Sequence, residues 1–205
     1  NEFEIYMITG NHDAWYKDTS EINSLSIFKG YKNIKIYDNL TSVSINDKHV
    51  TFCPWGTKID DIPQSDILFG HFELENFKMN AYKICDHGDD PEKLTKKSPL
   101  IFSGHFHREA VKTFNNDSSK IIYVGNPFEM DFGDIDSNKG FYILDFDSFE
   151  MEWINYNKIK IENERSYDLS GVDINQAIEE FINMLDIENR KDVVSYTQSL
   201  YEKVK

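Results

Sequence analysis

Residues 8–13 read ITGNHD and close an apolar run, residues 3–9, that is typical of a β-strand. Glycine permits the sharp backbone turn that a strand end needs, and the next three residues carry an amide, an imidazole and a carboxylate. Such side chains are rare in a hydrophobic core and common in ligand sites. Asn11, His12 and Asp13 are therefore the first candidate functional residues.

Two further apolar runs end in the same way: DILFGH at residues 66–71 and PLIFSGHFH at residues 99–107. They add His71, His105 and His107 to the candidates. In open α/β sheets, ligands bind beyond the carboxyl ends of the strands, so the three ends predict one crevice with four histidines and one asparagine. His105 and His107 would project to the same side of an extended backbone. Imidazole nitrogen together with amide or carboxylate oxygen suits Mn, Fe or Zn better than Ca or Mg.

A single histidine after a strand is usually an ordinary polar residue, so each motif alone has a simple structural explanation. The repetition of the pattern after three separate strands favours a shared metal site. The two remaining histidines fit the simpler explanation. We expect His49 in a hairpin turn and His87 in the acidic loop CDHGDDP to lie on the surface.

The length of 205 residues predicts one domain, with room for a small appendage, and the 40% hydrophobic and 14% aromatic residues are typical of a soluble globular protein. The sequence lacks an apolar run near the roughly 20 residues of a membrane span and a basic signal-peptide start, so we expect no membrane contact and a cytoplasmic location, the host cytoplasm if the chain is phage-encoded. The chain does not begin with Met, which favours a fragment. Cys53 and Cys85 have no zinc-type spacing, which favours free buried thiols, with a single disulfide as the alternative.

The net charge of −14 works against a broad phosphate-binding surface. A role on nucleic acid would need bound metal ions, local basic patches or a basic partner.

The pattern of apolar runs and turns predicts mostly strands over the first 160 residues. Hairpin turns are expected at residues 115–119 and 145–150, a helix at residues 19–30 with Ile22, Leu25, Ile27 and Phe28 facing inward, and a loop with a short helix at residues 75–97. Helical spacing over residues 173–205 predicts C-terminal helices. We place a domain boundary near residues 165–172, giving domains 1–168 and 169–205. The expected strands are residues 3–9, 34–37, 41–46, 49–53, 66–70, 99–103, 109–114, 120–124, 140–146 and 149–156.

The motifs together resemble those of the calcineurin-like metallophosphoesterases, whose pattern runs DxH, GDxxD, GNH(D/E), GH and GHxH. Residues 10–13, 70–71 and 104–107 match the last three motifs. Within this superfamily the sequence is most similar to the DNA double-strand-break repair nucleases, the bacterial SbcD type and their phage counterparts. The stretches KNIKIYDN, FCPWG and YVGNPFEMDFGDIDSNKGFYILD support that likeness. The resemblance covers roughly residues 3–160 and implies an α/β fold: a metallophosphoesterase-type β-sandwich flanked by helices, with its N-terminal part absent and C-terminal helices added.

The resemblance also implies roles for single residues. Asn11, His71 and His105 would bind one metal ion, and His107 would bind a second. His12 would lie beside the scissile phosphate as proton donor or transition-state stabiliser, with Asp13 orienting it. Two ions about 3.5–4 Å apart would activate water and neutralise phosphoryl charge. Mn²⁺ is the expected cofactor, with Mg²⁺, Fe and Zn as alternatives.

The DxH and GDxxD motifs do not occur ahead of the GNHD turn, where only ten residues precede Asn11. In the family they supply most ligands of one metal and the carboxylate that bridges both. We interpret the chain as about half of a two-metal site whose remainder was cut away, disordered or separately encoded. The alternative is a chain reduced to a non-catalytic role.

The leading functional hypothesis is a Mn-dependent DNA exonuclease or endonuclease subunit of a recombination and repair complex. The resemblance implies an SbcC-like coiled-coil ATPase partner and a homodimer, with the segment at residues 19–30 contributing to the dimer contact. One alternative is a phosphoesterase of the same fold that acts on small molecules or phosphoproteins. Another is a metal-free interaction module.

Overall fold

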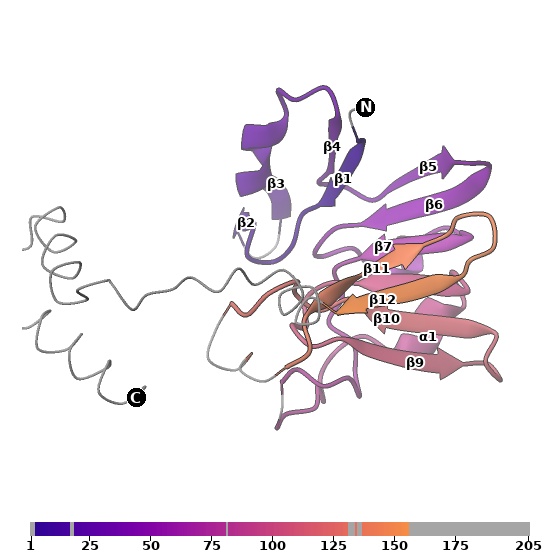
Figure 1. The fold of residues 1–205 in the computed structure, drawn as a ribbon. Helices are drawn as coiled ribbons and strands as arrows, with labels where there is room; N and C mark the ends of the chain where they lie inside the picture. The colour runs from indigo at the N-terminus through magenta and orange to yellow at the C-terminus, as the bar shows by residue number, and fades with distance from the viewer. Residues whose placement is uncertain (1–2, 17–18, 81, 131–133, 135–136, 156–205) are drawn as a thin grey trace, which may run out of the picture. The chain divides into compact units, whose positions relative to one another are not determined.

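The computed structural model describes residues 3–16, 19–80, 82–130, 134 and 137–155 (Figure 1). The chain divides into two units, Asn1–Glu162 and Asn163–Lys205, and every described residue belongs to the first. The predicted C-terminal helices and the predicted domain boundary lie outside the described residues and stay predictions. Among the described residues, the structure contains no helix long and apolar enough to cross a membrane.

A six-stranded mixed sheet forms the centre of the first unit, in the order β5-β6-β7-β8-β10-β9. Its four inner strands are parallel, and β5 and β9 pair antiparallel at the two edges. The register aligns the last residues of β6, β7 and β8, because Cys53 pairs with Gly70 and Gly70 with Ser103. The GH and GHFH motifs therefore leave the same edge of the sheet. The strands are β5 (Thr41–Ile45), β6 (Lys48–Cys53), β7 (Ile67–Gly70), β8 (Leu100–Ser103), β9 (Ala110–Phe114) and β10 (Ser119–Tyr123).

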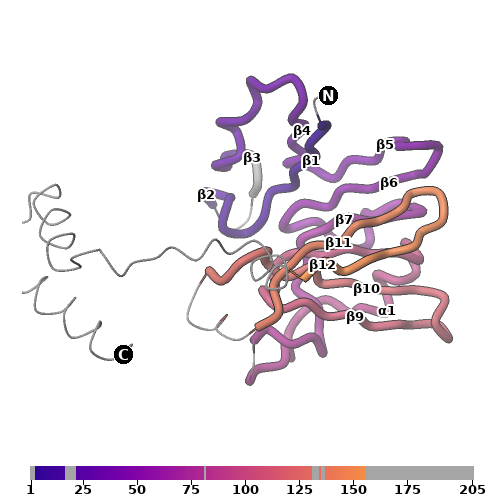
Figure 2. Tube along the Cα trace, in the orientation of Figure 1, coloured from indigo at the N-terminus to yellow at the C-terminus, as the bar shows by residue number. Residues whose placement is uncertain are grey.

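Three two-stranded pieces complete the described strands. β1 (Ile5–Ile8) pairs parallel with β4 (Ile34–Tyr37), and the two strands lie side by side in both views (Figures 1 and 2). β11 (Gly140–Leu144) pairs antiparallel with β12 (Met151–Asn155), and β2 (Ala14–Tyr16) pairs with β3 (Thr19–Asn23). All ten predicted strands are present within a few residues of their expected bounds, and the mixed α/β fold class is confirmed. β2 and β3 were not predicted.

Helices are few in the described part of the chain. They are the α-helix α1 (Pro91–Thr95) and the two 3₁₀-helices η1 (Ser24–Phe28) and η2 (Ile59–Asp61). The short helix expected within residues 75–97 is α1. The Asp90 side chain caps it by accepting a hydrogen bond from the Glu92 amide, and Pro91 occupies its first turn.

Both faces of the central sheet are covered, because successive residues along each inner strand point to opposite faces. Phe52, Ile67, Leu100 and Ile122 face one cluster, against which side chains of β1, β4, β11 and β12 pack. Their neighbours Cys53, Leu68, Ile101 and Ile121 face the other, which contains Leu94 of α1 and the loop residues Phe77 and Cys85. The layers of a sandwich follow from this alternation.

The predicted helix at residues 19–30 is wrong. The segment forms β3 and η1, and only Leu25 of the four residues expected to face inward is buried. Ile22 and Ile27 are 59% and 74% exposed. The reason is tertiary: Asn23 pairs with Ala14, and the Ser24 amide donates to the Asp13 carbonyl. Hydrogen bonding to the GNHD turn therefore outweighs the helical spacing of the apolar residues.

The remaining local predictions can be compared directly. The hairpin turn at 115–119 is confirmed, with Asn115, Asn116 and Asp117 in the left-handed region, and so is the turn between β11 and β12. Cys53 and Cys85 are both free and buried, which confirms the thiol interpretation. His49 lies in β6 opposite Ser44, not in the hairpin turn itself.

Candidate metal centre

The side chains of Asn11, His71 and His105 meet at the carboxyl end of the central sheet. His71 Nε2 lies 2.8 Å from Asn11 Oδ1, and His105 Nδ1 lies 3.4 Å from the same oxygen. The two imidazole rings are 5.3 Å apart between centroids and nearly perpendicular. Asn11 precedes His71 by 60 positions and His105 by 94 positions in the sequence. The fold nevertheless brings one side-chain oxygen and two ring nitrogens together.

Two motif glycines hold the His71 ring in this position. A Cβ atom at Gly10 would approach His71 Cε1 to 2.8 Å, and one at Gly104 would approach His71 Nδ1 to 2.9 Å. Both distances are shorter than side-chain contacts allow, so each glycine is required by the close approach of the ring. The glycines of the GNHD and GHFH motifs therefore leave the space that the histidine of the GH motif occupies.

Trp55 covers the same two imidazoles. Its ring stacks on His105 at 5.2 Å between centroids and meets His71 edge-on at 5.9 Å. The Trp55 amide donates to the Thr9 carbonyl, which fixes this loop to the end of β1. Trp55 lies in the FCPWG stretch, and the sequence did not predict its contact with the centre.

Burial keeps both histidines neutral. It lowers the pKa of His71 from 6.5 to about 4, and His105 nearby reinforces the shift. Burial also lowers the pKa of His105, although the Glu73 carboxylate acts in the opposite direction. Neutral imidazoles have a free nitrogen lone pair, which is the form that binds a metal ion.

His12 and Asp13 occupy the turn between β1 and β2. His12 is exposed, and its charge contributes to lowering the pKa of both His71 and His105, so its imidazole lies near the centre. The Asp13 carboxylate accepts hydrogen bonds from the Gly10 amide at 2.9 Å and from Ser24 Oγ at 3.2 Å. Asp13 thus braces the turn that presents His12. The specific roles of the two residues in catalysis stay predictions.

His107 lies on a different set of contacts from His105. Because His105 has a φ of +89°, the backbone there is not extended, and the expected same-side argument does not apply. Both histidines nevertheless line one cavity of about 270 Å³. His107 Nδ1 faces the Asp134 carboxylate at 3.6 Å.

A buried ion pair lies behind His107. Lys139 Nζ, on a side chain 1% exposed, is 2.7 Å from Asp134 Oδ1, and it donates to the His107 carbonyl at 3.1 Å and to Asn126 Oδ1. Although burial alone would raise it, the pKa of Asp134 is held well below its usual range by hydrogen bonds from Lys139, Asn126 and the Met130 amide. These residues fall inside the stretch quoted for the family likeness, but their role was not predicted.

The donor set fits a divalent transition metal. One amide oxygen and two neutral imidazole nitrogens converge within hydrogen-bonding distance, a combination suited to Mn, Fe or Zn. Glu73 Oε1 lies 3.8 Å from His105 Nε2 and can orient that ring, in the way that carboxylates orient metal-binding histidines elsewhere. Of the predicted ligands, the structure brings Asn11, His71 and His105 together. His107 lies beside them and contacts Asp134 and Lys139 instead.

Two known proteins are similar in sequence. The chain is 31% identical over 160 residues to exonuclease subunit 1 of Enterobacteria phage T4, a match that covers 73% of this chain and 44% of that protein. It is 26% identical over 214 aligned residues to the DNA double-strand break repair protein Mre11 of Methanocaldococcus jannaschii, covering 95% of this chain and 56% of that protein. The chain spans about half the length of these relatives. No model of a protein family matches it.

Proposed function

We propose that this chain, which belongs to the calcineurin-like metallophosphoesterases of the double-strand-break repair type, is part of a metal-dependent DNA nuclease that acts in a recombination and repair complex. The observation that carries the proposal is the convergence of Asn11 Oδ1, His71 Nε2 and His105 Nδ1 at one edge of the sheet. The names of the two relatives, an exonuclease subunit and a double-strand-break repair protein, support DNA as the substrate.

In this proposal Asn11, His71 and His105 hold one divalent ion and His107 contributes to a second. Bound ions would acidify a water molecule and neutralise the charge that develops on the phosphoryl oxygens. His12, exposed beside the centre, would donate a proton to the leaving oxygen or stabilise the transition state. Trp55 and the two motif glycines keep the imidazoles fixed, which limits the reorganisation needed when substrate binds. Mn²⁺ is the ion that we expect.

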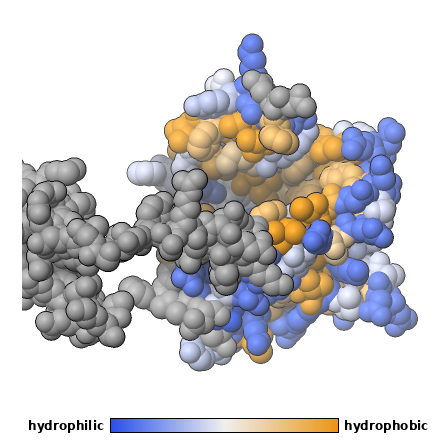
Figure 3. All heavy atoms as spheres, viewed as in Figure 1, coloured by the Kyte–Doolittle hydropathy of each residue, from blue (hydrophilic) through white to orange (hydrophobic). Residues whose placement is uncertain are grey.

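Strands that carry the DxH and GDxxD motifs would fit into the fold beside β1 and β11. An apolar cavity of about 620 Å³ lies between β1 and β11 and is lined by Tyr6, Ile8, Phe69, Phe102 and Tyr142. Figure 3 shows apolar side chains gathered beside a hollow on this face. Among the described residues, β1 and β11 each pair with a single strand. We infer that strands carrying the two motifs fill this space.

The surface of the β2–η1 region supports the proposed homodimer. Large apolar side chains are exposed there, among them Trp15 at 78% and Ile27 at 74%. Contiguous apolar patches on a protein surface mark protein–protein contact sites, and we propose that these side chains belong to one. The helix that was expected to make the contact is absent, but two of its apolar residues, Ile22 and Ile27, are exposed. A coiled-coil ATPase of the SbcC type is the second partner that we propose.

The net charge of −14 favours one alternative, a phosphoesterase of the same fold that acts on small phosphodiesters. The two functions separate in one experiment. The chain is combined with a polypeptide that carries the DxH and GDxxD motifs, and Mn-dependent cleavage of linear duplex DNA is compared with hydrolysis of a chromogenic phosphodiester. Preferential cleavage of DNA is expected.

The chain without that polypeptide should be almost inactive on DNA even in millimolar Mn²⁺, because a single imidazole, His107, cannot hold the second ion in place. Full activity of the chain by itself would contradict the two-metal proposal. Hydrolysis of the small phosphodiester without cleavage of DNA would favour the alternative.

A further inference from the structure

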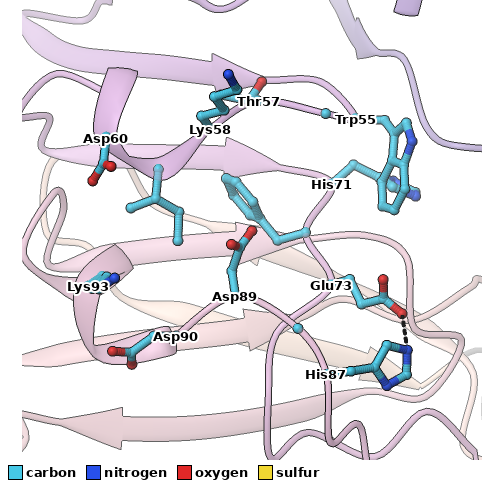
Figure 4. Close-up of a pocket in the computed structure, with 14 residues that line it drawn as sticks. Trp55, Thr57, Lys58, Asp60, His71, Glu73, His87, Asp89, Asp90 and Lys93 are labelled. Atoms are coloured by element: carbon cyan, nitrogen blue, oxygen red, sulfur yellow. Dashed lines mark ion pairs between the residues drawn. The ribbon is translucent and has the colours of Figure 1, made fainter. Parts of the chain in front are cut away.

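A second group of side chains that could hold a metal ion lies beside the candidate centre, and none of its three members is a proposed ligand of that centre. It consists of Glu73, Cys85 and His87, whose carboxylate oxygen, Sγ and ring nitrogen all lie within 4.8 Å of one another. His87 Nε2 and Glu73 Oε1 are already 3.5 Å apart, as the dashed line in Figure 4 marks. Two ligands of a tetrahedral zinc ion are separated by about 3.4 Å, given metal–ligand bonds near 2.1 Å.

The backbone holds the three residues in this register. The Asp89 amide donates to the Glu73 carbonyl at 2.8 Å, and the Cys85 amide donates to the Phe77 carbonyl at 2.8 Å. Gly88 allows the two segments to approach, because a Cβ at that position would lie 2.4 Å from the Glu73 carbonyl oxygen. Glu73 and the Cys85–His87 segment are therefore fixed against each other by main-chain contacts and glycine, independently of any ion.

The surroundings of His87 match those of a metal-binding histidine. Asp86 Oδ1 lies 2.7 Å from His87 Nδ1, so a metal ion bound to Nε2 would leave the ring proton on Nδ1, facing that carboxylate. A carboxylate on the far nitrogen is the usual partner of histidines that bind zinc. Burial and exposure are also divided in the expected way: Cys85 is fully buried, whereas the His87 side chain is 58% exposed and gives an ion access from solvent.

We propose that Glu73, Cys85 and His87 form a zinc site distinct from the phosphodiesterase centre, with water completing the coordination. A thiolate, an imidazole and a carboxylate are ligands that zinc accepts together, and the thiolate disfavours Mn²⁺ and Mg²⁺. Binding converts the Cys85 thiol to a thiolate and releases one proton to solvent. The site would tie the 73–89 segment together at the edge of the crevice that also contains His71 and Trp55, a cavity of about 610 Å³ (Figure 4).

Cobalt provides the test, because Co²⁺ replaces zinc and gives a near-ultraviolet charge-transfer band only when a thiolate binds it. The full 205-residue chain, stripped of metal, is titrated with Co²⁺ and then with Zn²⁺. The band should be complete within two equivalents of Co²⁺, because the Asn11–His71–His105 centre also accepts the ion. It should disappear when Zn²⁺ displaces Co²⁺, and it should persist in His105→Ala, since that centre contains no sulfur.

The two buried free cysteines give a matched pair of variants. Cys85→Ser should abolish the band, and Cys53→Ser should retain it. His87→Ala changes an exposed side chain and should keep the fold while lowering zinc affinity at least tenfold, and Asp86→Asn should lower it by about tenfold. A wild-type chain without the band, or a band that survives in Cys85→Ser, would overturn the proposal. Neither result bears on DNA cleavage, which is measured separately.

Discussion

The two halves of the candidate centre are built differently. Asn11, His71 and His105 come from three strand ends, and their ligand atoms already face one another within 2.8–3.4 Å. His107 lies next to them and contacts a buried ion pair between Asp134 and Lys139. Lys139 donates a hydrogen bond to the His107 carbonyl, and the Asp134 carboxylate faces the His107 ring. The first half, Asn11 with His71 and His105, provides three candidate ligands. The second half provides one candidate ligand, His107, and the ion pair that contacts it. In our proposal the chain therefore prepares one metal position by itself, and further groups complete the other.

Removal of the ion pair should have the largest effect. In Lys139→Met the Asp134 carboxylate stays buried without its cation, so we expect a loss of about 3–5 kcal/mol in the free energy of unfolding. Urea denaturation measures it. Lys29→Met is the control, because Lys29 forms an ion pair of 3.2 Å with Asp38 at the surface and should cost less than about 1 kcal/mol. Equal costs for the two variants would show that the His107 half does not depend on its buried support.

The next effect concerns His12, which lies near the first half but is not among its ligands. In the chain combined with the DxH and GDxxD motifs, His12→Ala should lower the rate of DNA cleavage by about a hundred- to a thousandfold. Mn²⁺ binding, measured by calorimetry, should not change. His49→Ala, at the far end of β6, is the control and should keep the rate. Loss of metal in His12→Ala would make His12 a ligand and extend the first half.

Metal affinity tests the comparison itself. His105→Ala should weaken Mn²⁺ binding to the 205-residue chain at least tenfold, about 1.4 kcal/mol, because one of three converging ligands is removed. His107→Ala should change the affinity by less than about threefold. Isothermal titration of both variants decides the point. If both weaken binding equally, the two halves share one ion and the distinction between them is wrong.

The last expected effect is on the pH dependence of stability. The pKa of His71 is about 4 in the folded chain, below the ordinary 6.5, because the ring is buried. Between these values the unfolded chain binds a proton that the folded chain does not, so stability from this group is complete above about pH 6.5 and is lost as the pH falls toward 4.

Replacement of the imidazole by an amide removes that titration. His71→Gln should therefore flatten the change in Tm between pH 6.5 and 4.5 by about 4–9 °C. Thermal melts of both proteins without metal, at closely spaced pH values, measure the difference. An unchanged slope would mean that His71 is accessible to protons in the folded chain.

The sequence predicted the strands and motifs of this protein because both depend on local pattern. Apolar runs bounded by turn residues gave all ten predicted strands, and glycine with polar residues after three of them identified Asn11, His71 and His105. The resemblance to metallophosphoesterases rested on those same residues, and the relatives confirm it. Segments whose structure follows from their own residues could therefore be predicted.

The tertiary structure decided what depends on partners distant in the sequence. Residues 19–28 have helical spacing, yet strand pairing with residues 14–16 and the Asp13 carbonyl made them β3 and η1. Trp55 joined the centre because the end of β1 holds its loop, and Lys139 became buried because Asp134 and the His107 carbonyl satisfy its charge. No local sequence pattern predicts that a tryptophan will contact a site or that a lysine will be buried. Only the contacts in the folded chain determine whether burial of such a side chain is favourable.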